Sequence, residues 1–228
     1  MTRSPFVLIH SPLVGPLTWQ PVADALRTQG YTVFVPELRD TPDSPLPFWR
    51  QHADSIALTI RDAILVGHSG AGALLPAISQ KLNASRILFV DAVLQFEAVT
   101  RLELMASEGG DFAEQFETYL KSGGRFPNWT DQQLQTMIPD AVLRSALLAD
   151  IRPRGLAFFT ERIDVPSGWD EIPCAYLQLS EFYSVYAAKA EAHGWPVIRH
   201  PSHHFAMVTE PEKVAALMVT LSEGGRTQ

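Results

Sequence analysis

The chain has 228 residues, 46% of them hydrophobic, and a formal net charge of −7 at pH 7. This length and apolar content predict one globular domain, or one domain with an insertion, that buries a core without disulfides or metals. The acidic balance, with no basic cluster, argues against binding to nucleic acid or to an anionic membrane. The single cysteine, Cys174, excludes an intramolecular disulfide, and the sequence has neither a signal core nor an apolar run of membrane-spanning length. We therefore expect a cytoplasmic protein.

Apolar runs and helical patterns alternate along the first 93 residues. Residues 6–9 form a continuous apolar run, as expected for a strand that is buried on both faces of a parallel sheet. Residues 31–35, 63–66 and 86–91 are expected to form three further strands. Helices are expected between these strands over residues 18–30 and 48–60. Strands that alternate with helices predict a mostly parallel sheet with helices on both faces, an α/β fold.

The alternation stops after residue 93. From residue 94 to residue 169 no strand of comparable quality is found, and apolar residues recur at helical spacing between glycines and prolines. We interpret residues 94–169 as a helical cap inserted into a core made of residues 1–93 and 170–228. The second part of the core adds strands over residues 174–179 and 195–199, a helix over residues 183–192 and a closing helix. The predicted sheet therefore has six strands.

The third predicted strand ends in residues 67–72, Gly-His-Ser-Gly-Ala-Gly, and a helix-forming stretch follows. A strand that turns abruptly into a helix forces the residue at the bend into a strained conformation, and small neighbours let the helix pass close to the strand. This pattern is typical of the nucleophile elbow, Gly-x-Ser-x-Gly, which exposes a serine hydroxyl above the sheet. Ser69 is the candidate nucleophile. The fifth position is Ala71 instead of glycine, with Gly72 next, and a glycine-rich turn without chemistry is the alternative.

A serine hydroxyl needs a base, which is itself oriented by a carboxylate. Groups that follow the ends of parallel strands gather at one edge of the sheet. His203 and His204 both follow the last predicted strand, and we predict His204 as the base, with His203 as the alternative. Asp91 ends the strand after the elbow strand, whereas Glu181 follows the next predicted strand. We favour Asp91 as the acid and keep Glu181 as the alternative.

These motifs make the chain resemble an α/β-hydrolase with a helical cap. Within that superfamily it is most similar to small esterases of the plant methylesterase and hydroxynitrile lyase group, and to uncharacterised bacterial relatives. The resemblance covers nearly the whole chain except the cap. The match is carried by residues 6–11, Trp19, residues 67–70, residues 204–207 and the pair Glu210-Pro211.

The acid and the residue after the base depart from the pattern of that group. In the plant enzymes the acid is an aspartate after the penultimate strand, and the matching position here is Phe182, with Glu181 beside it. Some haloalkane dehalogenase-like relatives carry their acid where Asp91 stands, which adds weight to Asp91. The members that cleave cyanohydrins place a lysine after the histidine. Phe205 stands at that position here, which argues against cyanide chemistry.

The oxyanion loop also departs from the family pattern. The family takes one oxyanion N–H from the residue that matches Pro12, which has no N–H. The amide of Leu13 or the hydroxyl of Ser11 must substitute for it, alongside the amide of Gly70. The loss of one such donor costs on the order of 3 kcal/mol of transition-state stabilisation. We assign His10, which precedes this loop, a positioning role.

We predict a serine hydrolase that cleaves a small, rather apolar ester or thioester through an acyl-enzyme on Ser69. The histidines show no metal-ligand spacing and no phosphate-binding loop is present, so we expect neither a metal nor an organic cofactor. The expected partner is a small-molecule substrate, and a homodimer is compatible with the sequence. Two alternatives stay open: a lyase, cyclase or dehydratase that uses the same pocket, and a catalytically weak ligand-binding protein. Candidate pocket walls are the cap aromatics Phe126, Trp129, Phe158 and Phe159.

Overall fold

The computed structural model of the protein describes residues 3–41, 43–106 and 112–224. Its main sheet has six strands in the order β2-β1-β3-β4-β7-β8. All of the pairs within this sheet are parallel, so the predicted α/β fold with a six-stranded sheet is confirmed. The strands are β1 (Phe6–Ile9), β2 (Val33–Phe34), β3 (Ile64–Ser69), β4 (Arg86–Ala92), β7 (Cys174–Gln178) and β8 (Val197–Arg199).

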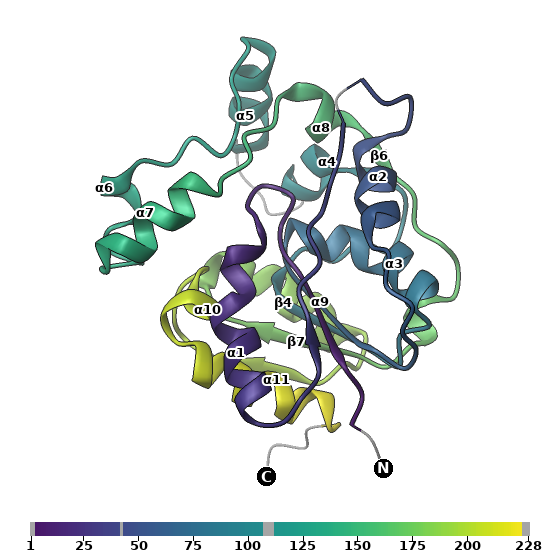
Figure 1. Ribbon diagram of the computed structural model, residues 1–228. Helices are drawn as coiled ribbons and strands as arrows, with labels where there is room; N and C mark the ends of the chain where they lie inside the picture. The colour runs from purple at the N-terminus through teal and green to yellow at the C-terminus, as the bar shows by residue number, and fades with distance from the viewer. Residues whose placement is uncertain (1–2, 42, 107–111, 225–228) are drawn as a thin grey trace.

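Both faces of the sheet are covered by helices, because successive side chains of a strand point to opposite faces. Phe6 and Leu8 of β1 pack in one buried cluster together with α1 (Gln20–Thr28), α10 (Ala206–Thr209) and α11 (Pro211–Ser222). Val7 and Ile9 pack in a second cluster together with α2 (Phe48–Ser55), α3 (Leu75–Leu82) and α9 (Ser184–Ala192). Figure 1 shows α1 and α10 to the left of the sheet, α11 at the bottom and α2 and α3 to the right. Burial on both sides explains why the strands are continuously apolar.

The helix that the sequence predicts over residues 48–60 is shorter in the structure. It ends at Ser55, and Ile56 has extended backbone dihedrals, φ −80° and ψ 95°. Ile56 is fully buried in the cluster around Val7 and Ile9. Burial of this side chain therefore outweighs the local helical pattern.

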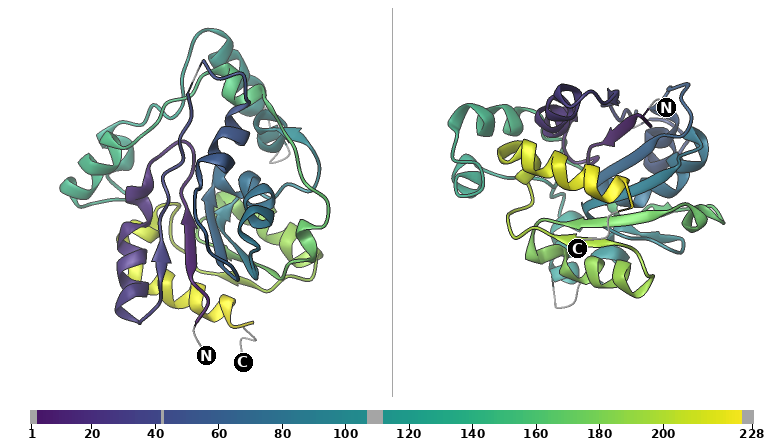
Figure 2. Two further views of the ribbon diagram at one scale, coloured as in Figure 1. Left: turned by 45° about the vertical axis from the view of Figure 1, so that its right-hand side comes forward. Right: turned by 90° about the horizontal axis from the view of Figure 1, so that it is seen from below.

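Most of the regular elements between β4 and β7 are helices, and α4, α5 and α8 lie beyond the end of the sheet where Ser69 ends β3. Figure 1 shows α5 at the end of the molecule opposite to the N-terminus, and Figures 1 and 2 show α6 and α7 projecting to one side. β5 and β6 form a two-stranded antiparallel sheet, which the sequence did not predict because strands of two residues show no periodicity. Residues 107–111, part of the predicted cap, lie outside the described residues. The elements are β5 (Val99–Thr100), α4 (Arg101–Ala106), α5 (Phe112–Lys121), α6 (Asp131–Leu134), α7 (Ala141–Ala149), α8 (Leu156–Thr160) and β6 (Arg162–Ile163).

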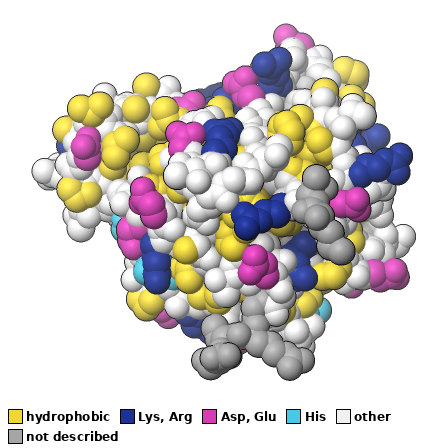
Figure 3. Space-filling model, turned by 60° about the horizontal axis from the view of Figure 1, so that its bottom comes forward, with side chains coloured by type: hydrophobic (Ala, Val, Ile, Leu, Met, Phe, Trp, Pro, Cys, Tyr) yellow, Lys and Arg dark blue, Asp and Glu magenta, His cyan; other side chains and the backbone are white. Residues whose placement is uncertain are grey.

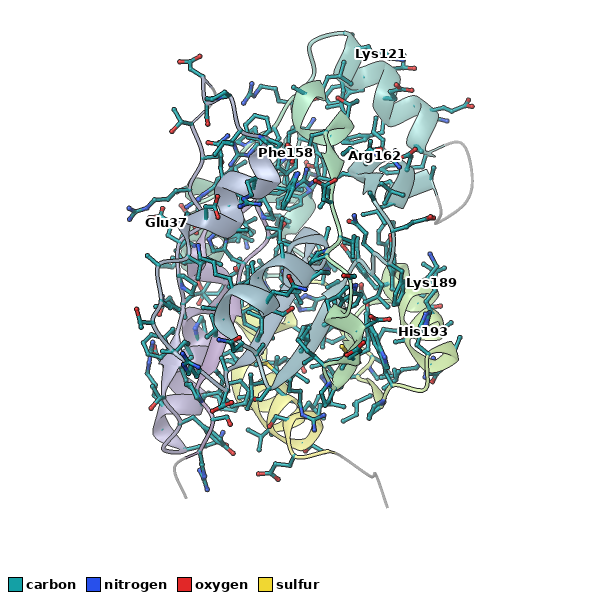
Figure 4. The ribbon with its side chains drawn as sticks, turned by 90° about the vertical axis from the view of Figure 1, so that its right-hand side faces the viewer. Glu37, Lys121, Phe158, Arg162, Lys189 and His193 are labelled. Atoms are coloured by element: carbon teal, nitrogen blue, oxygen red, sulfur yellow. The ribbon has the colours of Figure 1, made fainter. Side chains whose placement is uncertain are left out.

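Buried charges fasten this segment to the core. Glu161 accepts hydrogen bonds from the amides of Phe48 and Trp49, 2.6 and 3.0 Å away, at the first turn of α2. It also pairs with Arg101, whose guanidinium lies 3.8 Å from the ring centroid of Phe158. Figure 4 labels Phe158 in the layer where α8 meets α2. Glu161 and Arg101 therefore hold the segment between β4 and β7 against the start of α2.

The charge distribution on the surface and the length of the helices can be compared with the expected lack of nucleic-acid and membrane partners. On the face seen in Figure 3, positive and negative side chains are interspersed among apolar ones. Within the described ranges, no helix is both long enough and apolar enough to cross a bilayer.

Candidate active site

The turn after β3 holds Ser69 in a strained conformation, with φ 57° and ψ −129°. The 3₁₀ helix η2 (Gly70–Leu74) begins at the next residue and continues into α3. A Cβ on Gly72 would lie 2.0 Å from the carbonyl oxygen of Val93, and one on Gly67 would lie 2.7 Å from a side-chain carbon of Leu75. Glycine is therefore required at position 72, where the backbone of Val93 passes just after the end of β4. The glycine that follows Ala71 therefore allows the close approach of the backbone after β4.

Asp91 lies fully buried at the end of β4 and accepts a hydrogen bond from Nδ1 of His204 at 2.7 Å. Its other hydrogen bonds come from neutral donors, the amide of Leu179 at 2.8 Å and the amide and hydroxyl of Ser180 at 2.9 and 2.6 Å. Burial alone would raise the pKa of Asp91, but the hydrogen bond and charge of His204, with the bonds from Ser180, hold this pKa below its ordinary value. Glu181 is exposed. The carboxylate beside the His204 ring is therefore Asp91.

His204 is held through its backbone as well as through its ring. Nε2 of His68 donates to the carbonyl oxygen of His204 at 2.9 Å. Burial places the pKa of His68 well below its ordinary value, so this ring is neutral at physiological pH. The ring of His203 instead contacts the amide of Phe205 and the hydroxyl of Thr209, 3.3 and 3.0 Å away. The two adjacent histidines thus have separate partners, and only His204 contacts the buried carboxylate.

Tyr183 contacts both the serine and the histidine, and the sequence analysis assigned it no role. It ends the 3₁₀ helix η4 (Glu181–Tyr183), and its hydroxyl lies 3.2 Å from Oγ of Ser69. Its ring is parallel to the His204 ring, with centroids 4.9 Å apart and an interplanar angle of 2°. Among the described residues, no hydrogen bond joins Oγ of Ser69 directly to the His204 ring. The only sequence signal for Tyr183 is its place shortly after a strand end, which is shared by many residues without a function.

The predicted oxyanion residues lie together beside Ser69. Gly70 is the first residue of η2, where backbone amides have no acceptor within the helix. The hydroxyl of Ser11 accepts a hydrogen bond from the amide of Leu13 at 3.4 Å, and it lies 3.5 Å from where a Cβ on Gly70 would stand. Pro12 contributes no N–H, so Leu13 supplies the next backbone donor in this loop.

His10 fixes the loop that carries these donors. Its Nε2 accepts a hydrogen bond from the amide of Leu38 at 3.0 Å, and its Nδ1 donates to the carbonyl oxygen of Ser11 at 2.9 Å. These partners require a neutral ring, and burial lowers the pKa of His10 to about 4. The ring therefore links two loops and does not face the substrate cavity.

A cavity of about 440 Å³ opens above the serine. Its floor includes Ser69 and His204, and most of its wall is aromatic or aliphatic. Trp129 and Phe205 both line it, and their rings meet edge to face with centroids 5.4 Å apart. Phe126 and Phe159 line it as well, whereas Phe158 packs behind the wall against Arg101. Other apolar lining residues are Leu13, Val14, Ala73, Val93, Leu104, Met105, Phe112, Met137 and Phe182.

No group of three or more His, Cys, Asp or Glu side chains suited to a metal ion occurs in the part of the chain that the structure describes. Three features that can take part in acyl transfer meet at the cavity floor. They are a hydroxyl at a strained turn, an imidazole with a buried carboxylate on one nitrogen, and amide donors at a helix start.

Comparisons with known proteins agree with this fold. A family model described as the alpha/beta hydrolase family matches residues 6–217, so the resemblance seen in the sequence is confirmed. No curated protein matches the chain in sequence.

Three solved structures illustrate the likeness. An extracellular alpha/beta-hydrolase from a Paenibacillus species, described as sharing structural and functional homology with tobacco salicylic acid binding protein 2, has a TM-score of 0.77 at 22% identity and covers 99% of this chain and 100% of its own. A variant of tomato methylketone synthase I complexed with beta-ketoheptanoate has a TM-score of 0.71 at 15% identity, with 98% and 99% covered. A pyrethroid hydrolase from Sphingobium faniae JZ-2 has a TM-score of 0.68 at 20% identity, with 96% and 97% covered. At these identities the likeness is one of fold.

Proposed function

This chain belongs to the alpha/beta hydrolase family, and on that premise we propose that it is a serine hydrolase that cleaves a small, rather apolar ester or thioester. The observation that carries the proposal is the 2.7 Å hydrogen bond between Asp91 and Nδ1 of His204, close to the strained turn of Ser69 at the cavity floor. Because Nδ1 donates to the carboxylate, Nε2 is the ring nitrogen that has a lone pair and can accept a proton. The family assigns the class of enzyme, and this pair supports the assignment of roles.

In the proposed reaction, Oγ of Ser69 attacks the carbonyl carbon while its proton passes to Nε2 of His204. Asp91 holds the imidazole in orientation and stabilises the imidazolium that forms. The bond to the leaving group then breaks, and His204 returns the proton to the departing oxygen or sulfur. Water next attacks the acyl-enzyme with the same assistance, which releases the acid and restores Ser69.

The negative charge on the carbonyl oxygen needs donors on the side of the β1 loop. We assign this role to the amides of Gly70 and Leu13, with the hydroxyl of Ser11 between them. His10 positions the loop through its two hydrogen bonds. Such preorganised donors contribute several kcal/mol of transition-state stabilisation when they point at the developing charge, roughly 3 kcal/mol for each donor.

The cavity wall supports an apolar acyl or alcohol group as the substrate. Trp129 and Phe205 form part of an aromatic wall, and a volume of about 440 Å³ lies within the range of small-molecule sites. We propose that residues 94–169 act as a cap, because α4, α5 and α8 contribute Leu104, Phe112 and Phe159 to this wall. Differences in the cap would then set substrate preference while the core residues carry out the reaction.

A fluorophosphonate probe tests the nucleophile. We expect stoichiometric labelling of the wild-type protein at Ser69 and none of a Ser69→Ala variant. An absence of labelling in the wild type, or equal labelling of both proteins, would contradict the proposal. Product formed in ¹⁸O-labelled water distinguishes hydrolysis from lyase, cyclase or dehydratase chemistry, because hydrolysis must place solvent oxygen in the acid product.

A further inference from the structure

We propose that Tyr183 is a further catalytic residue, whose hydroxyl donates a hydrogen bond to the oxygen that leaves the substrate and then to the water that replaces it. This inference rests on the serine hydrolase reaction proposed above. Its first support is contact with a reacting atom, since the Tyr183 hydroxyl lies 3.2 Å from Oγ of Ser69. The side chain also lines the cavity together with Ser69 and His204. Any group bonded to Oγ therefore forms within reach of this hydroxyl.

The position of Tyr183 is fixed by the same carboxylate that orients the base. Asp91 binds the amides of Leu179 and Ser180 and the hydroxyl of Ser180, and this is the turn from which η4 starts. At the other end of η4, the Tyr183 ring stacks on the imidazole of His204. The Tyr183 hydroxyl is thus held in a fixed position next to Ser69. The side chain therefore needs little movement when negative charge develops beside it.

The sheet order tells which side of the serine Tyr183 occupies. β1, which leads to the loop with Ser11 and Leu13, lies on one side of β3, whereas β4 and β7 lie on the other. Tyr183 follows β7 and stacks on His204. It therefore stands opposite to the oxyanion loop, on the side where His204 gives its proton to the leaving group. This placement assigns Tyr183 to the leaving group and not to the carbonyl oxygen.

The proposed step moves no proton through Tyr183. In the resting enzyme its hydroxyl is hydrogen-bonded to Oγ of Ser69. During attack the Ser69 proton passes to His204, the Oγ–carbon bond forms, and Oγ becomes a poorer acceptor as it turns into an ester oxygen. As the carbon–oxygen bond of the leaving group breaks, the departing oxygen gains negative charge and accepts the Tyr183 hydrogen bond until His204 protonates it. Hydrogen bonds to charged oxygens are roughly twice as strong as neutral ones.

The test is the variant Tyr183→Phe, which removes the hydroxyl and keeps the ring stacked on His204. We would measure kcat/KM on two esters of the same short acyl group, one with an ethyl and one with a p-nitrophenyl leaving group. The leaving group of the ethyl ester is ethoxide, which does not stabilise its own charge. We therefore expect kcat/KM for this ester to fall by about tenfold to a hundredfold. The p-nitrophenolate spreads its own charge, and we expect its kcat/KM to fall by less than about threefold.

Tyr186→Phe is the matched control, because Tyr186 is fully buried near Tyr183 and donates its hydroxyl to the carbonyl oxygen of Leu104 at 3.2 Å. Its loss should affect both esters equally, and thermal unfolding of each variant reports on the fold. An equal loss on both esters in Tyr183→Phe, no loss, or a gain in rate would overturn the role assigned to Tyr183. Fluorophosphonate labelling of the wild type distinguishes failure of this inference from failure of the proposed function. If Ser69 is labelled, the ester comparison tests the role of Tyr183 alone; if Ser69 is not labelled, the proposed hydrolase itself is contradicted.

Discussion

Among the residues that the structure describes, two buried aspartate–histidine pairs differ in their surroundings. Asp91 binds Nδ1 of His204 at 2.7 Å, and Asp40 binds Nε2 of His52 at 2.8 Å. Both aspartates are at least nine-tenths buried by side-chain exposure, and His52 is fully buried. His204 lines the cavity beside Ser69. Within the described part of the chain, the second ring nitrogen of His52 is buried without a hydrogen-bond partner. A close carboxylate–imidazole pair is therefore not enough to mark a catalytic base.

The two pairs differ in whether a positive side chain neutralises the aspartate. The Asp91 carboxylate receives neutral donors besides His204, so its negative charge is available to stabilise an imidazolium. The Asp40 carboxylate is held on both oxygens by the guanidinium of Arg154, at 2.8 and 2.6 Å. Burial, followed by the nearby charges of Arg101 and Arg154, keeps the pKa of His52 below its ordinary value despite the bond to Asp40. The surroundings of Asp91 fit the orienting role that we propose for it, whereas Asp40 joins Arg154, from the segment between β4 and β7, to His52 of α2.

We expect the largest effect when the same substitution is made at His204 and at His52. We expect His204→Gln to lower kcat for ester hydrolysis by roughly 10⁴-fold or more, because the nucleophile loses its base. His52→Gln should leave kcat little changed once the protein is folded, since His52 faces neither the serine nor the cavity. Steady-state kinetics on the p-nitrophenyl ester measure both. If both variants fold and lose kcat to a similar extent, the claim that His204 and not His52 acts as the base would be wrong.

The second comparison concerns stability and uses two arginines. Arg154→Met leaves the buried carboxylate of Asp40 without its guanidinium, and we expect the free energy of unfolding to fall by about 3–5 kcal/mol. Arg50→Met is the matched control at an exposed pair, because the side chains of Arg50 and Asp54 are 55% and 48% exposed. We expect it to change the free energy of unfolding by less than about 1 kcal/mol. Urea unfolding followed by fluorescence gives both values. A loss below about 1 kcal/mol in Arg154→Met would contradict a stabilising role for the pair of Arg154 and Asp40.

The smallest effect is a pH dependence that comes from His10. Its pKa falls from an ordinary value of 6.5 to about 4 on burial, so the unfolded chain binds a proton in a pH range where the folded chain does not. The neutral ring makes its full contribution to the free energy of unfolding above pH 6.5. This contribution is lost as the pH falls to about 4, which lowers the free energy of unfolding by about 3 kcal/mol. We expect His10→Asn to reduce the pH dependence of the free energy of unfolding in this window. The same slope in His10→Asn and wild type would contradict the buried neutral ring.

Much of the fold could be predicted because the strands are buried on both faces. Each strand appears as an apolar run, and the turn at Ser69 needs glycines at fixed positions, so both leave a strong local pattern. The end of α2 at Ser55 was predicted too late, because the burial of Ile56 depends on distant partners. The antiparallel pair of β5 and β6 was missed because strands of two residues leave no periodic signal. The sequence also did not reveal that Phe158 packs behind the cavity wall, because that depends on its contact with Arg101 in the folded protein.

The sequence by itself determined the order of the strands along the chain, the strained turn at Ser69 and a short set of candidates for the base and the acid. It did so because backbone turns and two-sided burial restrict residue types locally. Only the tertiary structure decided that Asp91 rather than Glu181 contacts His204, that the similar pair of Asp40 and His52 is neutralised by Arg154, and that Tyr183 reaches Ser69. Those relations depend on which side chains from distant segments meet, and on the charge and burial that they share when they do.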